Sequence, residues 1–152
     1  MNAEQEVPNH NEGALVGTWR LISFDVEGQA TGKRRPAFGN VPKGRLMLLA
    51  NGFMMVFLAA EHRQTAKTNE EKAEAFNTMI AYSGKYKIEG ENFITDVDLA
   101  WQEAWAGAKQ VRTFRFVGAR VQFTSAWAPS AFDPDRIVRG ILVFERELSA
   151  AG

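Results

Sequence analysis

The feature that most restricts the fold of this 152-residue chain is the alternation of tight and long connections between its strand-like segments. Such segments are rich in β-branched and aromatic residues or alternate apolar with polar ones. Tight turns follow every second segment, and the clearest is Asn51-Gly52, because both residues tolerate the positive φ of a short hairpin. The eight segments are residues 15–26, 45–50, 53–60, 82–88, 93–99, 110–117, 120–125 and 137–148.

The long connections predict how these strands are arranged. They fall between the first and second, third and fourth, fifth and sixth, and seventh and eighth strands. In an antiparallel meander, alternate connections lie at opposite ends, so the tight turns share one end and the long connections the other. Closing the sheet removes its exposed edges and leaves an interior for one small ligand. We therefore expect an all-β, eight-stranded up-and-down antiparallel barrel; a β-sandwich of the same strands is the alternative.

One helix is expected between the third and fourth strands. Thr68 and Glu71 form a capping-box pattern, and Ala73, Phe76 and Ile80 follow at helical spacing. This pattern predicts a helix over about residues 69–81 that lays its apolar stripe against the sheet. The nearby run MMVFLAA is apolar on both faces and needs cover outside the barrel as well as inside. The helix or a second subunit of a homodimer would supply that cover.

Composition excludes several classes of function. The chain has 18 basic and 18 acidic residues and no cysteine, so it carries neither a basic nucleic-acid footprint nor disulfides or thiolate metal sites. Residues 1–13 are expected to form a disordered arm without an apolar signal, ahead of a single domain over 14–149. No apolar run approaches the roughly 20 residues of a membrane span, so we expect a cytoplasmic location. The cluster Lys33-Arg34-Arg35 is either a solvated loop or an anion site.

Metal, haem and hydrolase chemistry find little support. Only His10 and His62 are present, and His62 with Glu61 makes no recognisable ligand set. A serine-hydrolase elbow of the form G-x-S-x-G is absent. We therefore predict no metal and no cofactor.

Trp19 follows Gly17 at the start of the first strand and therefore lies near the tight-turn end. The last strand finishes at the same end, and its alternation places Arg146 on the face of Phe144. A guanidinium stacked on an indole is favourable by about 1 kcal/mol. We interpret Trp19 and Arg146 as a structural floor rather than as an active site.

The pair also carries a resemblance to a known family. Gly17-x-Trp19 with a late arginine resembles the lipocalin or calycin barrel, and the longer match is to the bacterial and fungal lipocalin-like domain family. The resembling stretches run in order from about residue 15 to 148: GTWRLISFDVEG, PKGRLMLLANGFMMVFLAAEHR, EEKAEAFNTMIAYSGKYKIEG, VDLAWQEAWAGAKQVRTF and LVFERE. The resemblance implies an eight-stranded barrel with a small-molecule cavity. Members often place histidine where this chain has Thr95-Asp96.

Aromatic residues gather in the long connections at the open end of the predicted barrel. Either they plug the mouth, or they form an apolar rim that admits a flat or hydrophobic molecule. These residues are Phe38, Trp101, Trp105, Trp127 and Phe132.

Arg112 is the most informative charge, because it alternates with Phe114 and so is expected to point into the barrel. A buried guanidinium needs a partner, which would be Asp98, Glu103 or an anionic ligand.

Hydroxyl groups are expected to assist Arg112 at the ligand. Tyr82 and Tyr86 open the fourth predicted strand at the mouth, and Ser23 shares the face of Trp19. The alternative for each tyrosine is a core position with a satisfied hydroxyl.

Together these residues predict a protein that binds a small hydrophobic metabolite, with or without an anionic group, in its barrel. The alternative is an isomerase or cyclase in which Arg112 and Tyr86 stabilise developing oxyanion charge. No general base is evident inside, which favours binding over catalysis without deciding the matter. A filled barrel that acts as an interaction module is a third interpretation.

Overall fold

A computed structural model of the chain describes residues 13–130 and 133–150. Most of the predicted N-terminal arm, with His10, and the rim candidate Phe132 lie outside the described residues.

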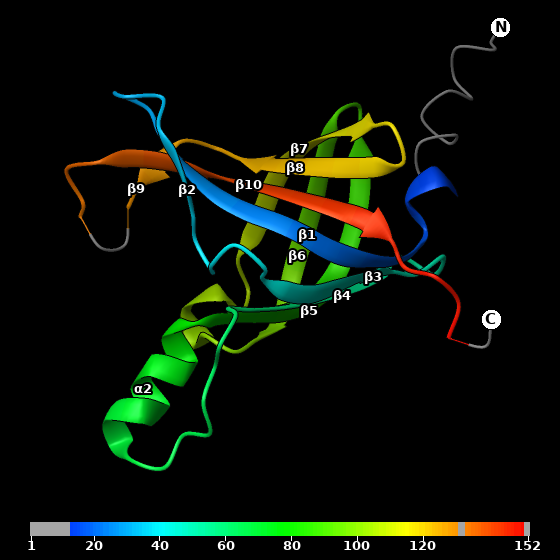
Figure 1. Cartoon of the computed structure of the whole chain (residues 1–152). Helices are drawn as coiled ribbons and strands as arrows, with labels where there is room; N and C mark the ends of the chain where they lie inside the picture. The colour runs from blue at the N-terminus through cyan, green and yellow to red at the C-terminus, as the bar shows by residue number, and fades with distance from the viewer. Residues whose placement is uncertain (1–12, 131–132, 151–152) are drawn as a thin grey trace, which may run out of the picture.

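Eight antiparallel strands form one closed barrel (Figure 1). Each strand pairs with its neighbour along the chain, and the last pairs with the first from Trp19↔Arg146 to Gly28↔Val138. The predicted up-and-down barrel is confirmed, and the sandwich alternative is wrong. The strands are β1 (Gly17–Gly28), β3 (Lys43–Leu48), β4 (Phe53–Ala59), β5 (Met79–Glu89), β6 (Asn92–Ala100), β7 (Lys109–Val117), β8 (Arg120–Ser125) and β10 (Ile137–Arg146).

Two short strands that the sequence did not predict extend the sheet at the open end. β2 (Arg34–Pro36) pairs with residues 25–27 of β1, and β9 (Ala128–Pro129) pairs with the start of β10. The two lie on the same side of the barrel in Figure 1. A short 3-10 helix, η2 (Glu103–Trp105), lies in the connection from β6 to β7.

The helix α2 (Asn69–Asn77) begins where the capping box predicts. The Thr68 hydroxyl accepts from the Glu71 amide at 3.1 Å, and the Glu71 carboxylate accepts from the Thr68 amide at 2.9 Å. The helix ends before residue 78, however, and Ile80 belongs to β5.

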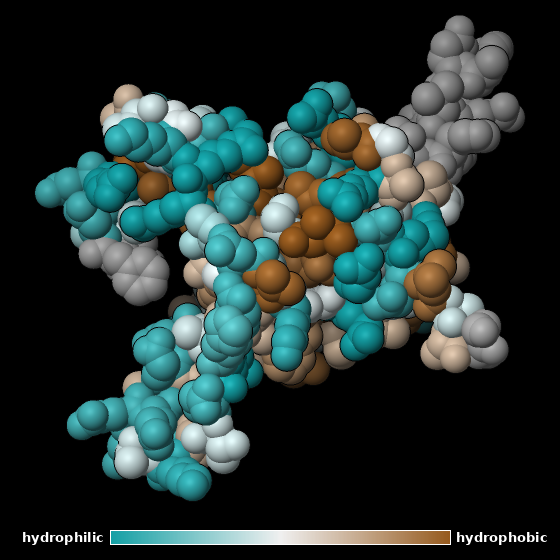
Figure 2. All heavy atoms as spheres, in the orientation of Figure 1, coloured by the Kyte–Doolittle hydropathy of each residue, from teal (hydrophilic) through white to brown (hydrophobic). Residues whose placement is uncertain are grey.

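The expected packing of the helical stripe on the sheet is wrong. No residue of α2 is buried, Phe76 is 40% exposed, and the helix projects away from the barrel (Figure 1). Its sequence NEEKAEAFN distributes charge around the axis, so it offers no apolar face wide enough to pack. This part of the surface is largely hydrophilic in Figure 2.

The outer face of β4 is consequently left without helical cover. Met55, Phe57 and the neighbouring Leu99 are 55%, 51% and 70% exposed, whereas Met54, Val56 and Leu58 point into the core. The other source of cover, a second subunit, stays a prediction.

At the closed end, Trp19 is buried at 2% exposure and donates its indole N–H to the Leu15 carbonyl at 2.9 Å. The Arg146 guanidinium lies 4.3 Å from the centroid of the Trp19 ring. From this pair the core continues toward the open end through Leu46, Phe144, Phe123 and Phe93.

Candidate functional site

The open half of the barrel contains a cavity of about 360 Å³. This volume falls within the range of about 300–1,000 Å³ that is usual for small-molecule sites. Its wall is mostly apolar and comes from strands all round the barrel, with Trp105 added from η2. The lining residues are Phe24, Val26, Leu46, Met54, Val56, Leu58, Ile80, Tyr82, Phe93, Trp105, Arg112, Phe123, Ser125, Val138, Arg139, Gly140, Leu142 and Phe144.

A β-bulge in β1 decides which of its side chains face this cavity. The register against β10 passes from Leu21↔Phe144 to Ser23↔Val143, so one residue of β1 is left without a partner. The inward positions therefore change from Trp19 and Leu21 to Phe24 and Val26. The expectation that Ser23 shares the inward face of Trp19 is wrong for this reason.

Arg112 is the cation of β7 that lies in the cavity wall. Within the sheet it pairs with Phe93 on one side and Ser125 on the other, and both of these also line the cavity. Its guanidinium donates to the Val111 carbonyl at 3.3 Å, a long hydrogen bond.

The carboxylates expected to neutralise Arg112 face elsewhere. Asp98 is exposed and accepts from the Ser83 hydroxyl at 2.8 Å, and Glu103 is exposed on η2. Among residues 13–130 and 133–150, no carboxylate oxygen lies within ion-pair distance of Arg112. Its charge is therefore balanced by no side chain of the described barrel.

Tyr82 supplies the phenol of the cavity. Its ring lies 5.4 Å from that of Trp105, and its hydroxyl forms no hydrogen bond with the described residues. Burial raises the pKa of Tyr82 above its usual value of 10.0, and the positive charge of nearby Arg112 opposes part of that increase. The phenol is therefore protonated at neutral pH and can donate a hydrogen bond.

Tyr86 lies farther down β5, close to the tight-turn end. Its hydroxyl donates to the Leu49 carbonyl at 2.9 Å, and its amide donates to the Gly52 carbonyl. The expected place at the mouth, beside Tyr82, is therefore corrected. Phe114 does not line the cavity either: it is buried at 6% exposure in the aromatic core, where its ring lies 6.3 Å from that of the lining residue Phe123.

The remaining aromatic candidates surround the cavity without lining it. Phe38 packs edge-on against Phe24, with 5.1 Å between the ring centroids. Trp101 donates its indole N–H to the Phe76 carbonyl of α2 and lies 5.1 Å from Trp105. Trp127 is 37% exposed and carries the Arg139 guanidinium at 4.3 Å. Of the predicted ligand-binding residues, the structure brings Arg112, Tyr82 and Trp105 together.

Several residues that line the cavity were not among the binding residues predicted from the sequence. Phe93 and Phe123 alternate correctly along β6 and β8, so strand periodicity was a usable signal for both. Phe24 had no such signal, because the bulge that turns it inward depends on β10. Ser125 is also in the wall, where its hydroxyl accepts from the Gly140 amide at 2.7 Å.

Two further observations bear on the kind of site. No group of three or more His, Asp or Glu side chains in the described part of the chain is arranged to hold a metal ion. The described helices include none with the length and apolar character required to span a bilayer.

Comparison with known proteins agrees with this geometry. A family model for the lipocalin-like domain matches residues 16–147, which is most of the chain. A search of curated proteins found no match.

Proposed function

Because the chain belongs to the lipocalin-like domain family, a group with the barrel fold of ligand-binding proteins, we propose that its barrel binds a small hydrophobic ligand with an anionic group. The anionic group in this proposal is a carboxylate or an enolate. The proposal places the binding in the cytoplasm.

The observation that carries this proposal is that Arg112 lies in a mostly apolar wall and has no carboxylate partner among the described residues. The other cation of this wall, Arg139, is paired with Glu27 at 2.7 Å. The Arg112 side chain is half-buried. A guanidinium partly removed from water without a counterion is unfavourable, and a ligand anion beside it would offset that cost. A carboxylate fits the planar fork of arginine with two parallel hydrogen bonds. The apolar side chains around it would accept the rest of the ligand and favour it over water.

Tyr82 adds a second polar contact. Since burial keeps its phenol protonated, it would donate a hydrogen bond to the same anionic group. Trp105 stands against the Tyr82 ring and would limit the space at the mouth end of the cavity. The site would thus hold an acidic end at Arg112 and Tyr82 and an apolar body toward Phe123 and Phe144.

The same two donors support an alternative, an isomerase or cyclase. Arg112 and Tyr82 would then stabilise an oxyanion that develops in the transition state of an apolar substrate. Incubation of the protein with a bound ligand, followed by mass spectrometry of the released molecule, separates the two. Isomers have the same mass, so chromatographic retention and fragmentation decide between the two functions. Unchanged retention and fragmentation support binding, and a product with a different retention time supports the enzyme.

A matched pair of probes tests the anionic part of the proposal. Calorimetric titration with decanoate and with decanol compares one apolar chain with and without a carboxylate. Arg112→Leu is expected to weaken decanoate binding by about 2 kcal/mol or more and to leave decanol binding nearly unchanged. Arg115→Leu is the control, because Arg115 lies on the same strand but lines an outer groove.

Equal losses for decanoate and decanol in Arg112→Leu would contradict an anion site at this arginine. An effect of Arg115→Leu as large as that of Arg112→Leu would show that net charge, rather than position, determines the affinity.

A further inference from the structure

A second, smaller pocket of about 230 Å³ lies at the rim of the open end, between β2 and the start of β10. Four of its seven lining residues are cations, and none is a carboxylate. Val26 and Val138 also line the large cavity, so the two spaces share part of their wall. The lining residues are Val26, Gly28, Lys33, Arg34, Arg35, Arg136 and Val138; we refer to them as the basic rim pocket.

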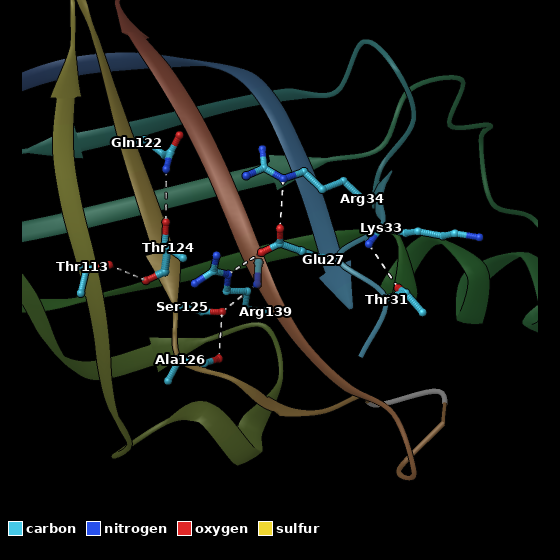
Figure 3. A network of polar contacts seen from close by, with 11 residues as sticks. Glu27, Thr31, Lys33, Arg34, Thr113, Gln122, Thr124, Ser125, Ala126 and Arg139 are labelled. Atoms are coloured by element: carbon cyan, nitrogen blue, oxygen red, sulfur yellow. Dashed lines mark hydrogen bonds and ion pairs between the residues drawn. The ribbon is translucent and has the colours of Figure 1, made fainter. Parts of the chain in front are cut away.

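One side of the basic rim pocket is a hairpin formed by β1 and β2. The pairs Val26↔Arg35 and Glu27↔Arg34 set its register. Its turn is held by the Gly28 amide, which donates to the Lys33 carbonyl at 3.0 Å. The Lys33 amide also donates to the Thr31 hydroxyl at 3.2 Å (Figure 3). The β1–β2 hairpin thereby holds the consecutive cations Lys33, Arg34 and Arg35 at the edge of the pocket.

The other side comes from the β9–β10 hairpin. The Arg136 carbonyl accepts from the Ser130 amide at 2.8 Å, and the Gln29 amide donates to the Ile137 carbonyl at 2.9 Å, which ties the two hairpins together. Gly28 places the two sides of the pocket close together. A Cβ built on Gly28 would lie 4.0 Å from an Nη of Arg136, so the guanidinium lies directly beside this glycine.

The pocket has an excess of positive charge that the described residues do not neutralise. Glu27 pairs with Arg34 at 3.5 Å, but the same carboxylate also holds Arg139 at 2.7 Å (Figure 3). Its hydrogen bond with Arg139 is the main reason that the pKa of Glu27 is lowered.

The other three cations have no such partner. Lys33, Arg35 and Arg136 form no ion pair with a carboxylate of the described chain. The nearest acidic residues along the chain, Asp133 and Asp135, do not line the pocket, and the Asp133 carboxylate accepts from the Asp135 amide. Since the whole chain has a formal net charge of zero, this is a local accumulation rather than a general excess.

We propose that the basic rim pocket binds a phosphate or diphosphate group at the mouth of the barrel. Phosphate oxygens accept paired hydrogen bonds from the arginine guanidinium and are attracted by the positive charge of the lysine ammonium group. Several converging cations therefore fit a multiply charged phosphate better than a singly charged carboxylate. The wall shared through Val26 and Val138 puts a group bound here next to the opening of the large cavity. The proposal does not depend on what occupies that cavity, because inorganic pyrophosphate has no apolar part.

Inorganic pyrophosphate is the probe. Amide chemical shifts of isotopically labelled full-length protein are followed during its titration at constant ionic strength, with sodium chloride as the reference salt. We expect saturable shifts at Gly28, Lys33 and Val138 that chloride does not produce. Combined Lys33→Gln, Arg35→Gln and Arg136→Gln should weaken binding at least about tenfold, which corresponds to about 1.4 kcal/mol.

The matched control removes the same charge elsewhere, by Lys72→Gln, Lys85→Gln and Lys87→Gln, which are exposed positions outside the pocket. It should bind pyrophosphate as the wild type does. If the triple variant of the pocket does not fold, Arg35→Gln alone, at an exposed position of β2, takes its place.

Vesicles distinguish a free phosphate from a lipid headgroup. Co-sedimentation with vesicles that contain phosphatidic acid, but not with pure phosphatidylcholine, would identify a membrane lipid as the source, again with loss in the pocket variant. Absence of saturable binding to both pyrophosphate and phosphatidic acid would overturn the proposal. Equal losses in the pocket and control variants would overturn it as well.

Discussion

Arg146 stacks on Trp19 at 4.3 Å, and the same guanidinium donates to the carbonyl groups of Val16 and Ala14. One side chain of the last strand thus satisfies the backbone just before the first strand and covers its buried indole. This contact joins the first and last strands, β1 and β10, at the closed end of the barrel. Arg112 belongs instead to the cavity wall in the open half.

We expect Arg146→Ala to lower the free energy of unfolding by about 1–3 kcal/mol, because the stacking, the packing and two hydrogen bonds are lost together. Urea unfolding measures the change. Decanoate affinity should stay the same under conditions where the variant is folded. The control is Arg45→Ala, because the Arg45 side chain is exposed and its ion pair with Glu147, at 3.6 Å, contributes little. Loss of binding without loss of stability would assign Arg146 to the ligand site.

Gly17→Ala should destabilise the barrel through the same contact. Gly17 has a φ of 140°, and a Cβ there would lie 2.4 Å from an Nη of Arg146. We expect a loss of about 1–3 kcal/mol from backbone strain and displacement of the guanidinium.

A double-mutant cycle separates these two causes for Gly17. In the Arg146→Ala background the steric part disappears, so Gly17→Ala should cost less than in the wild type. Equal costs in both backgrounds would show that backbone strain alone is responsible.

Tyr82 makes stability sensitive to alkaline pH. Its folded-state pKa is raised by burial, so the unfolded chain releases this proton at a lower pH than the folded chain does. The stabilisation is fully present below about pH 10 and is lost as the pH rises toward the folded-state pKa. Urea unfolding at increasing pH should show a steeper alkaline loss for the wild type than for Tyr82→Phe. Parallel curves would indicate that the phenol ionises as freely in the fold as in the unfolded chain.

The uncovered outer face of β4 leads us to expect self-association. Phe57→Glu would place a charge in the middle of the exposed apolar side chains Met55, Phe57 and Leu99 and should shift a dimer to the monomer. Sedimentation velocity over a wide range of concentrations measures this shift. Phe53→Glu is a suitable control, because Phe53 is also exposed, at 41%, but lies at the end of the strand. A wild-type monomer at every concentration would contradict a second subunit as the cover.

The order of the strands could be predicted because turns and apolar periodicity are local properties. Asn51-Gly52 predicted its hairpin, and Thr68 with Glu71 predicted the start of α2, since each signal acts within a few residues of chain. The position of Trp19 and Arg146 at one end followed from counting antiparallel passes. Arg112 followed in the same way, because alternation along the unbroken strand β7 places it on one face.

Only the tertiary structure decided which groups reach the cavity and which of them are already satisfied. Ser23 turned out to face away because β1 bulges against β10, and alternation along one strand cannot show an extra residue that its partner leaves unpaired. The Tyr86 hydroxyl donates a hydrogen bond to the carbonyl of Leu49, a residue 37 positions away in the sequence. The basic rim pocket likewise needs Arg136 beside the sequence cluster Lys33-Arg34-Arg35. A sequence determines the pattern along each strand, but partners across the sheet are determined by the closed barrel, whose geometry depends on all eight strands together.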